Sequence, residues 1–192
     1  MVAVLTPQAD IAFMNCAAKR AFLGASDTPT DGLSLHHFYR ADVVQELTTL
    51  ISSVLTTKRP HLYRCMRRGV GLEATLMPWS GASDRSDLVM LVAHTGRSSP
   101  PADQPQLPVL ESRYVELGKL AVLSPRELEV MAMLRRPLSM PQIAESLHRS
   151  GKTIDRHVSS VREKLNVHSR LEMLRLADAA DLQIWHASSI RI

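Results

Sequence analysis

The chain has 192 residues, of which 45% are hydrophobic and 22% charged, and its formal net charge is +4. This size and composition suit one large or two small globular domains and exclude a chain dominated by disorder. The two cysteines, Cys16 and Cys65, have no paired spacing, which excludes a disulfide framework and predicts buried, unpaired thiols in a reducing compartment. The opening residues carry no basic segment and no apolar run approaches the roughly eighteen residues of a membrane span, so we expect a cytoplasmic protein.

The start of the chain predicts a hairpin followed by two helices. Short β-prone runs at residues 2–5 and 11–14 flank a turn-like segment, and a short helix is expected at residues 16–22. A longer helix is predicted from Asp42 to about residue 57, because apolar side chains recur there at helical spacing and form one face that packs on a sheet. This face comprises Val44, Leu47, Ile51 and Val54.

Three further strands are predicted at residues 62–66, 70–77 and 88–93. The expected order of elements is therefore β-β-α-loop-α-β-β-β. The main alternative is a receiver domain, which needs alternating strands and helices with an acidic cluster at the strand ends. The sequence has neither feature.

This order of elements is similar to that of PAS sensor domains. The first residues of the chain also resemble the start of such domains, and they read Val2-Ala-Val-Leu-Thr-x(4)-Ile-Ala-Phe-Met-Asn15-x-Ala-Ala-x-Arg-Ala-Phe-Leu-Gly24. Over residues 1–95 the resemblance implies an α+β fold, with a five-stranded antiparallel sheet and helices on one face, that senses a signal or mediates dimerisation. Two alternatives stay open: a small pocket, empty or holding an unspecified small molecule, and a filled core used only for dimerisation. The pocket would be lined by Phe13, Leu47, Leu72 and Leu91. No cofactor is predicted.

Residues 96–120 are predicted to connect two domains. Prolines cluster in this stretch and predict a semi-rigid linker, and residues 111–120 are expected to form a short helix. The prolines are Pro100, Pro101, Pro105 and Pro108.

Four short helices are predicted within residues 121–187. The first opens with the capping box Ser124-Pro-Arg-Glu127 and ends before Pro137, the second opens with Ser139-Met-Pro-Gln142, and the fourth opens with Ser169-Arg-Leu-Glu172. The third runs from Ser150, its predicted cap, to Leu165. Its apolar residues Ile154, Val158, Val161 and Leu165 share one face. The opposite face is polar, with side chains that can bond to base edges or phosphates.

The spacing of these blocks resembles the LuxR-type helix-turn-helix domain of bacterial transcription regulators. The matching blocks are Leu123-Ser-x-Arg-Glu-x-Glu-Val130, Leu138-Ser139, Ile143-Ala144-x-x-Leu147, Ser150-x-x-Thr-Ile154, His157, Lys164-Leu165-x-Val167 and Ser169-Arg170. The resemblance implies an all-α module of four helices that binds double-stranded DNA through the third helix in the major groove. The fourth helix of such modules commonly mediates dimerisation.

We therefore expect residues 121–187 to bind DNA and to form a homodimer. The base-reading candidates are Asp155, Arg156 and Ser159, near the start of the polar face. The phosphate-contact candidates are Lys152, Thr153, His157, Arg162 and Lys164. The dimerisation candidates on the fourth helix are Leu171, Arg175, Asp178 and Leu182.

Asp155 stands where many members of the family carry Lys, and an acidic side chain repels phosphate. A competing hypothesis is therefore a protein-interaction regulator whose helix-turn-helix module no longer binds DNA. Enzyme activity is not expected, because the sequence has no nucleophile elbow and no glycine-rich phosphate loop. No metal site is expected either, because the spacing of the potential ligands fits no motif. These potential ligands are His36, His37, His61 and Cys65.

Overall fold

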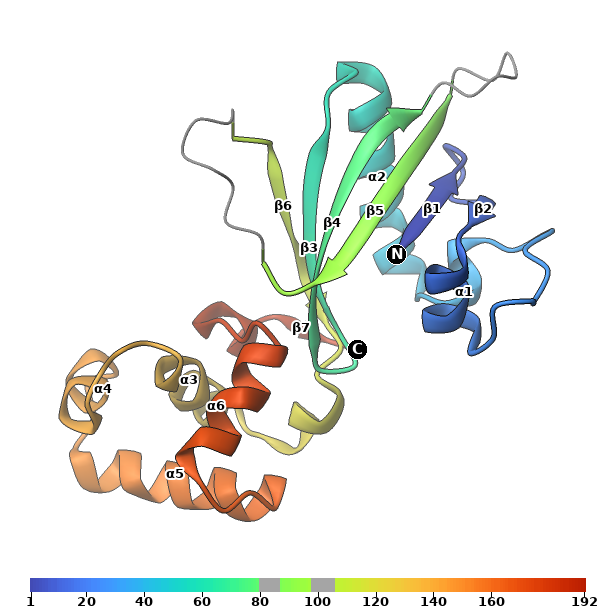
Figure 1. Cartoon of the computed structure of the whole chain (residues 1–192). Coiled ribbons are helices and arrows are strands. Elements are labelled where there is room, and N and C mark those ends of the chain that lie inside the picture. The colour runs from blue at the N-terminus through green and yellow to red at the C-terminus, as the bar shows by residue number, and fades with distance from the viewer. Residues whose placement is uncertain (80–86, 98–105) are drawn as a thin grey trace. The chain divides into compact units, whose positions relative to one another are not determined.

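The computed structural model of the chain describes residues 1–79, 87–97 and 106–192. These residues form two compact units, and Figure 1 follows the chain through both. Unit 1 comprises the described residues of Met1–Arg64, Glu73–His94 and Ser98–Ser112. Unit 2 comprises Cys65–Leu72, Thr95–Arg97 and Arg113–Ile192. Most of the predicted linker prolines, Pro100, Pro101 and Pro105, lie outside the described residues.

Seven strands in the described part of the chain form one sheet, in the order β2-β1-β5-β4-β3-β6-β7. They are β1 Val2–Leu5, β2 Ile11–Met14, β3 His61–Arg67, β4 Val70–Trp79, β5 Leu88–Thr95, β6 Val109–Val115 and β7 Ile190–Arg191. The first five strands lie where the sequence predicted them. The prediction of a five-stranded sheet was wrong, because β6 and β7 extend it.

Strand β6 occupies residues 111–115, for which a helix was predicted. Ser112 and Val115 of this strand are both buried, and β7 pairs with it in parallel through Tyr114 with Ile190 and Val115 with Arg191. Exposed edge strands present unpaired backbone groups, and the added strands satisfy those groups locally. Strand β6 lies between β3 and β7 in the sheet, and β7 comes from the far end of the chain, so no local sequence pattern predicts this pairing.

Unit 1 contains the predicted hairpin and both predicted helices, α1 Cys16–Leu23 and α2 Ala41–Thr57, together with the short 3-10 helix η1 Leu35–His37. Strands β1 and β2 pair antiparallel, and Figure 1 shows α2 running behind the strands. Helix α2 buries its apolar face, in which Val44, Ile51 and Val54 are inaccessible to solvent. This helix therefore supplies much of the core of unit 1.

Two predictions about side chains of unit 1 were wrong. Phe13 is 51% exposed and borders an open apolar hollow, so it does not line an interior pocket. The other residues around this hollow are Val2, Val4, Ala12, Trp79, Leu88 and Met90. Cys16 is exposed rather than buried, because it occupies the first position of α1, outside the packed face of that helix. Neither Cys16 nor Cys65 forms a disulfide with another described residue.

Unit 2 contains the four predicted helices of the C-terminal module. They are α3 Pro125–Leu134, α4 Met140–Ser146, α5 Gly151–Leu165 and α6 Arg170–Ala179, with the short 3-10 helices η2 Gly118–Val122 and η3 Ile184–Ala187. The capping boxes at Ser124 and Ser139 are both present. At α6 the box is incomplete, because the Glu172 carboxylate accepts from the backbone of His168, one residue before the Ser169 cap.

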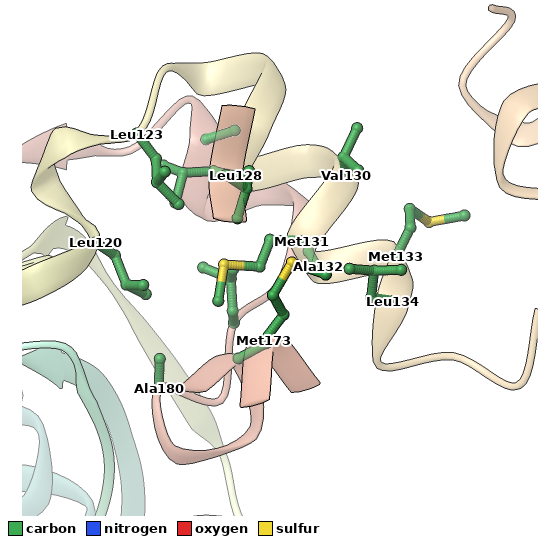
Figure 2. Packing of buried hydrophobic residues seen from close by; sticks show 14 of the residues in the cluster. Leu120, Leu123, Leu128, Val130, Met131, Ala132, Met133, Leu134, Met173 and Ala180 are labelled. Atoms are coloured by element: carbon green, nitrogen blue, oxygen red, sulfur yellow. The ribbon is translucent and has the colours of Figure 1, made fainter. Parts of the chain in front are cut away.

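The core of unit 2 is built around α3, which contacts α4, α5, α6 and η3. Figure 2 shows Leu128 and Met131 of α3 directed into a cluster that also holds Met173 of α6. Burial of each such side chain contributes about 1.5–3 kcal/mol, so these contacts dominate the stability of the helical module. The helix that carries the candidate site packs directly on this core.

The end of α6 is fixed by the buried carboxylate of Asp181. Arg135 donates to it from Nη2 at 2.8 Å, and Arg97 donates to its second oxygen. Burial works to raise the pKa of Asp181, but the hydrogen bonds from Arg97 and Arg135 outweigh it and lower the pKa. Gly71 approaches this point so closely that a Cβ there would lie 2.5 Å from the Cβ of Asp181. Only glycine fits that position without a shift of the neighbouring backbone.

No helix in residues 1–79, 87–97 or 106–192 has both the length and the apolar character needed to cross a bilayer. Within the same ranges, no three His, Cys, Asp or Glu side chains gather into a group that would hold a metal ion.

Candidate nucleic-acid interface

Helix α5 is fixed in length by a cap at each end. Ser150 accepts from the backbone N–H of Thr153 at 3.2 Å, and the hydroxyls of Ser150 and Thr153 lie 2.8 Å apart. At the other end Asn166 takes the left-handed conformation with φ of 52°, and its N–H bonds back to the carbonyl groups of the last turn. These caps hold α5 at 15 residues, a length of about 22 Å.

One face of α5 anchors the helix to unit 2. Ile154 and Val161 are fully buried, and Val158 and Leu165 pack against the same cluster. The predicted apolar face is therefore confirmed. Because this face is buried against α3 and α4, the rotation of α5 about its own axis is fixed, and so is the face that it turns to solvent.

The three base-reading candidates lie together on that solvent face. Asp155, Arg156 and Ser159 are all exposed, and i, i+1 and i+4 spacing places them on neighbouring turns. Within the part of the chain that the structure describes, none of their three side chains has a hydrogen bond or an ion pair. Arg156 is thus not engaged by Asp155 or Ser159, and its guanidinium group is available to a ligand.

The five phosphate-contact candidates differ in their surroundings. Lys152 is exposed and pairs with no described residue, whereas the hydroxyl of Thr153 is engaged with the Ser150 cap. His157 is half-buried, and Arg162 donates to the backbone carbonyl of His168 in the turn after α5. The backbone of that turn limits where the Arg162 guanidinium can reach.

Lys164 is held within unit 2 by a carboxylate under α5. Its ammonium group donates to both oxygens of Glu127, at 2.8 and 2.9 Å. Ser160, one turn earlier on the same flank of α5, donates to Glu127 Oε1 at 2.7 Å. The other oxygen of Glu127 accepts from the backbone N–H and the hydroxyl of Ser124, at 2.7 and 2.9 Å. Glu127 therefore joins the start of α3 to the second half of α5.

The Glu127 side chain is only 5% exposed, yet it stays ionised. Burial raises the pKa of this carboxyl group, but the hydrogen bonds from Lys164, Ser124 and Ser160 outweigh burial and lower the pKa to about 2. The capping box predicts the local half of this cluster. Ser160 and Lys164 lie 33 and 37 residues away from Glu127, and no pattern in the sequence links them to it.

A further cation was missed by the sequence analysis. Arg149 immediately precedes the Ser150 cap and is exposed, and its side chain forms no hydrogen bond or ion pair with any residue that the structure describes. Together with Lys152 it places two uncompensated positive charges at the start of α5. The residue pair His148-Arg149 directly before a Ser cap is the sequence signal that would have identified it, because the N-terminus of a helix favours anions such as phosphate.

The predicted dimerisation face on α6 is only partly available. Leu171 is 55% exposed and Arg175 is exposed. Asp178 pairs within the chain with Arg135, at 2.9 Å. Leu182 lies beyond the end of α6 and is 1% exposed, so its placement on an exposed helix face was wrong. Burial in the core of unit 2 accounts for this apolar side chain.

Comparison with known families supports the identity of this module. Residues 121–177 match the family model described as bacterial regulatory proteins, luxR family. These residues form a LuxR-type helix-turn-helix domain. The resemblance found in the sequence blocks is confirmed, and the match covers α3 to α6 almost completely.

Similar full-length proteins cover more of the chain at lower identity. Response regulator protein VraR of Staphylococcus aureus is 25% identical over 143 residues, which are 74% of this chain and 65% of that protein. The VraR protein of Staphylococcus epidermidis is 26% identical over 144 residues, with the same coverage. The matched stretch is thus less than two thirds of the length of these relatives.

Among solved structures, the chain matches a Vibrio cholerae VqmA in complex with ligand and DNA at a TM-score of 0.49 and 15% identity. The match covers 92% of this chain and 81% of that one. The PAS domain of histidine kinase ThkA has a TM-score of 0.37 and 18% identity, covering 48% of this chain and 95% of that one. The region before the LuxR-type domain is mixed α/β, with strands β1 to β6 and helices α1 and α2.

The acid dependence of unit 2 tests the Glu127 cluster. A pKa lowered in the folded state stabilises the fold at pH values above the ordinary carboxyl pKa of 4.5, and this contribution is lost as the pH falls toward about 2. We expect hydrogen-exchange protection of α3 and α5 amides to fall across this window in the unaltered chain, and less steeply in Glu127→Gln. An identical acid dependence in the two proteins would contradict the assignment.

Lys164→Met provides the second arm of the same test. It should lower the free energy of unfolding of unit 2 at neutral pH by about 1–3 kcal/mol, because Glu127 stays buried with one donor fewer. Lys152→Met is the matched control, since Lys152 is exposed and has no partner among the described residues, and it should change stability by less than about 0.5 kcal/mol.

Proposed function

We propose that the chain is a sequence-specific DNA-binding transcription regulator whose helix α5 enters the major groove of double-stranded DNA. The observation that carries the proposal is the free polar face of α5, where Asp155, Arg156 and Ser159 have no partner among the described residues. A helix is about 10–12 Å across and the major groove is about 12 Å wide, so this face can reach base edges. The LuxR-type domain supplies the scaffold.

Within this proposal the candidate residues take different roles. Arg156 reads a base, because its fork of donors matches the two acceptors of guanine. Lys152 contacts phosphate, and we add Arg149 to the phosphate contacts Thr153, His157 and Arg162. Lys164 is assigned to holding α5 in place, since the Glu127 carboxylate already neutralises it.

Unit 1 is proposed to sense a signal or to mediate dimerisation, as its resemblance to PAS domains implies. Phe13 and Trp79 expose large apolar surfaces beside the same open hollow, which favours dimerisation. The competing function, a protein-interaction regulator that no longer binds DNA, is favoured by one observation, the exposed acidic side chain of Asp155 on the reading face.

Salt-dependent binding separates the two functions. The intact chain is used to select from a random duplex library, and the affinity of the selected duplex is measured over a range of salt concentrations. We expect one group of sequences to be enriched and log affinity to fall with log salt, by about 0.9 for each phosphate contacted. Enrichment of no sequence, with no dependence on salt, would favour the protein-interaction regulator.

Arg156 and Lys152 are expected to respond differently on the same helix. Arg156→Ala should cost about 1–3 kcal/mol on the selected duplex and relax the preference at one position per half-site. Lys152→Ala should weaken binding to selected and scrambled duplexes alike and reduce the salt slope by about one. If Arg156→Ala lost equal affinity for both duplexes, Arg156 would be a phosphate contact instead of a reader.

Dimerisation through α6 is tested with Leu171→Asp. A single reading helix gives little selectivity, and paired half-sites about 34 Å apart require two copies. We expect sedimentation velocity to show a dimer for the unaltered chain and a weakened one for Leu171→Asp, with the stability of unit 2 unchanged because Leu171 is 55% exposed. Val122→Asp is the control, because Val122 is 56% exposed and lies outside α6. A dimer that Leu171→Asp leaves intact would place the interface elsewhere.

A further inference from the structure

Asp155 differs from the acidic residues of α3, Glu127 and Glu129, in having no ion pair among the described residues. It is exposed on the second turn of α5 and has no cation within ion-pair distance among residues 1–79, 87–97 and 106–192. By contrast, Glu127 pairs with Lys164, and Glu129 pairs with Arg126 at 2.7 Å. Structural ion pairing therefore accounts for Glu127 and Glu129 but leaves Asp155 unexplained.

An unpaired carboxylate on a face that meets DNA has a cost that does not depend on sequence. Repulsion between one carboxylate and a nearby phosphate weakens binding by about two- to fivefold in water. The cost is offset only where a donor on a base edge meets the carboxylate, and in the major groove the amino group at N4 of cytosine is the donor that acidic side chains accept. Asp155 is close to the start of α5, the part of a reading helix that reaches base edges.

We propose that Asp155 is a specificity-determining residue that lowers the affinity of the domain for DNA in general and restores it at one G·C pair per half-site, where the cytosine amino group donates to its carboxylate. This inference rests on the proposed function of α5. Arg156, the next residue, prefers guanine, so the two side chains together select a half-site rich in G·C pairs at the positions that they read. The acidic residue thereby raises the ratio of specific to non-specific binding.

Two other substitutions sharpen the test. Asp155→Asn keeps the shape of the side chain, removes its charge, and presents the amide that pairs with N6 and N7 of adenine. Glu163→Ala removes an equal charge from another exposed acidic residue of α5. Glu163 lies eight residues further along, about 12 Å from Asp155 along the helix axis, in the half that base edges do not meet.

The experiment measures binding of the intact chain and its variants to the selected duplex, to each single-base change of that duplex, and to a scrambled duplex at one salt concentration. For Asp155→Ala we expect affinity for the scrambled duplex to rise about two- to fivefold, and a roughly tenfold preference for cytosine at one position to disappear. Asp155→Asn should move that preference to adenine. Glu163→Ala should leave every base preference unchanged.

The outcomes separate this inference from the proposed function. If the unaltered chain selects a sequence but Asp155→Ala keeps all of its base preferences, or fails to raise affinity for scrambled DNA, the role of Asp155 is overturned and DNA binding stands. If the unaltered chain selects no sequence, both are overturned. Misfolding is excluded by an unchanged thermal unfolding curve, which is expected because Asp155 contacts no described side chain through a hydrogen bond or an ion pair.

Discussion

The geometry of the candidate interface depends on one buried carboxylate. Glu127 lies beneath α5, where burial alone would favour its neutral form, and it stays charged because Ser124, Ser160 and Lys164 all donate to it. Removing a charge from water is costly unless such donors surround it, so the cluster forms only when α3 and α5 are correctly packed. It therefore fixes the flank of α5, as Ile154 and Val161 fix its apolar face. With both sides held, one face is left for a ligand.

The features predicted correctly from the sequence are those that depend on neighbouring residues. Capping at Ser124, Ser139 and Ser150 involves groups three residues apart, so the start of each helix could be predicted from the sequence. The apolar face of α5 follows in the same way from helical spacing, and so do the five strands of residues 1–95 from alternation and turn residues. These signals are local, and tertiary packing did not override them.

The contacts that could not be predicted are those whose partner is distant in sequence. The ion pair of Lys164 with Glu127 is one of them, because only packing brings the two side chains together. Leu182 continued the spacing of α6 in the sequence, but the helix ends at Ala179 and the chain turns at Asp181, with φ of 46°, to bury Leu182. Strand β7 has only two residues, and it is a strand because it pairs with β6, which is distant in the sequence. Such contacts are properties of the whole fold, and periodicity carries no information about them.

Long-range pairing also changes how the charge of the C-terminal module should be understood. Residues 121–187 hold ten basic and eight acidic side chains, a balance that gives no reason to expect DNA binding. Several of those acids are already neutralised inside the module, since Glu127 is paired with Lys164 and both Asp178 and Asp181 are paired with Arg135. Arg149, Lys152 and Arg156 have no such partner among the described residues. Asp155 on the same turns is also unpaired among the described residues, so a phosphate approaching the start of α5 meets these three cations against one nearby carboxylate. The net charge of the whole module does not show this local excess of positive charge. For a domain of this kind, the arrangement of unpaired charges decides whether DNA is attracted, and that arrangement is set by the fold.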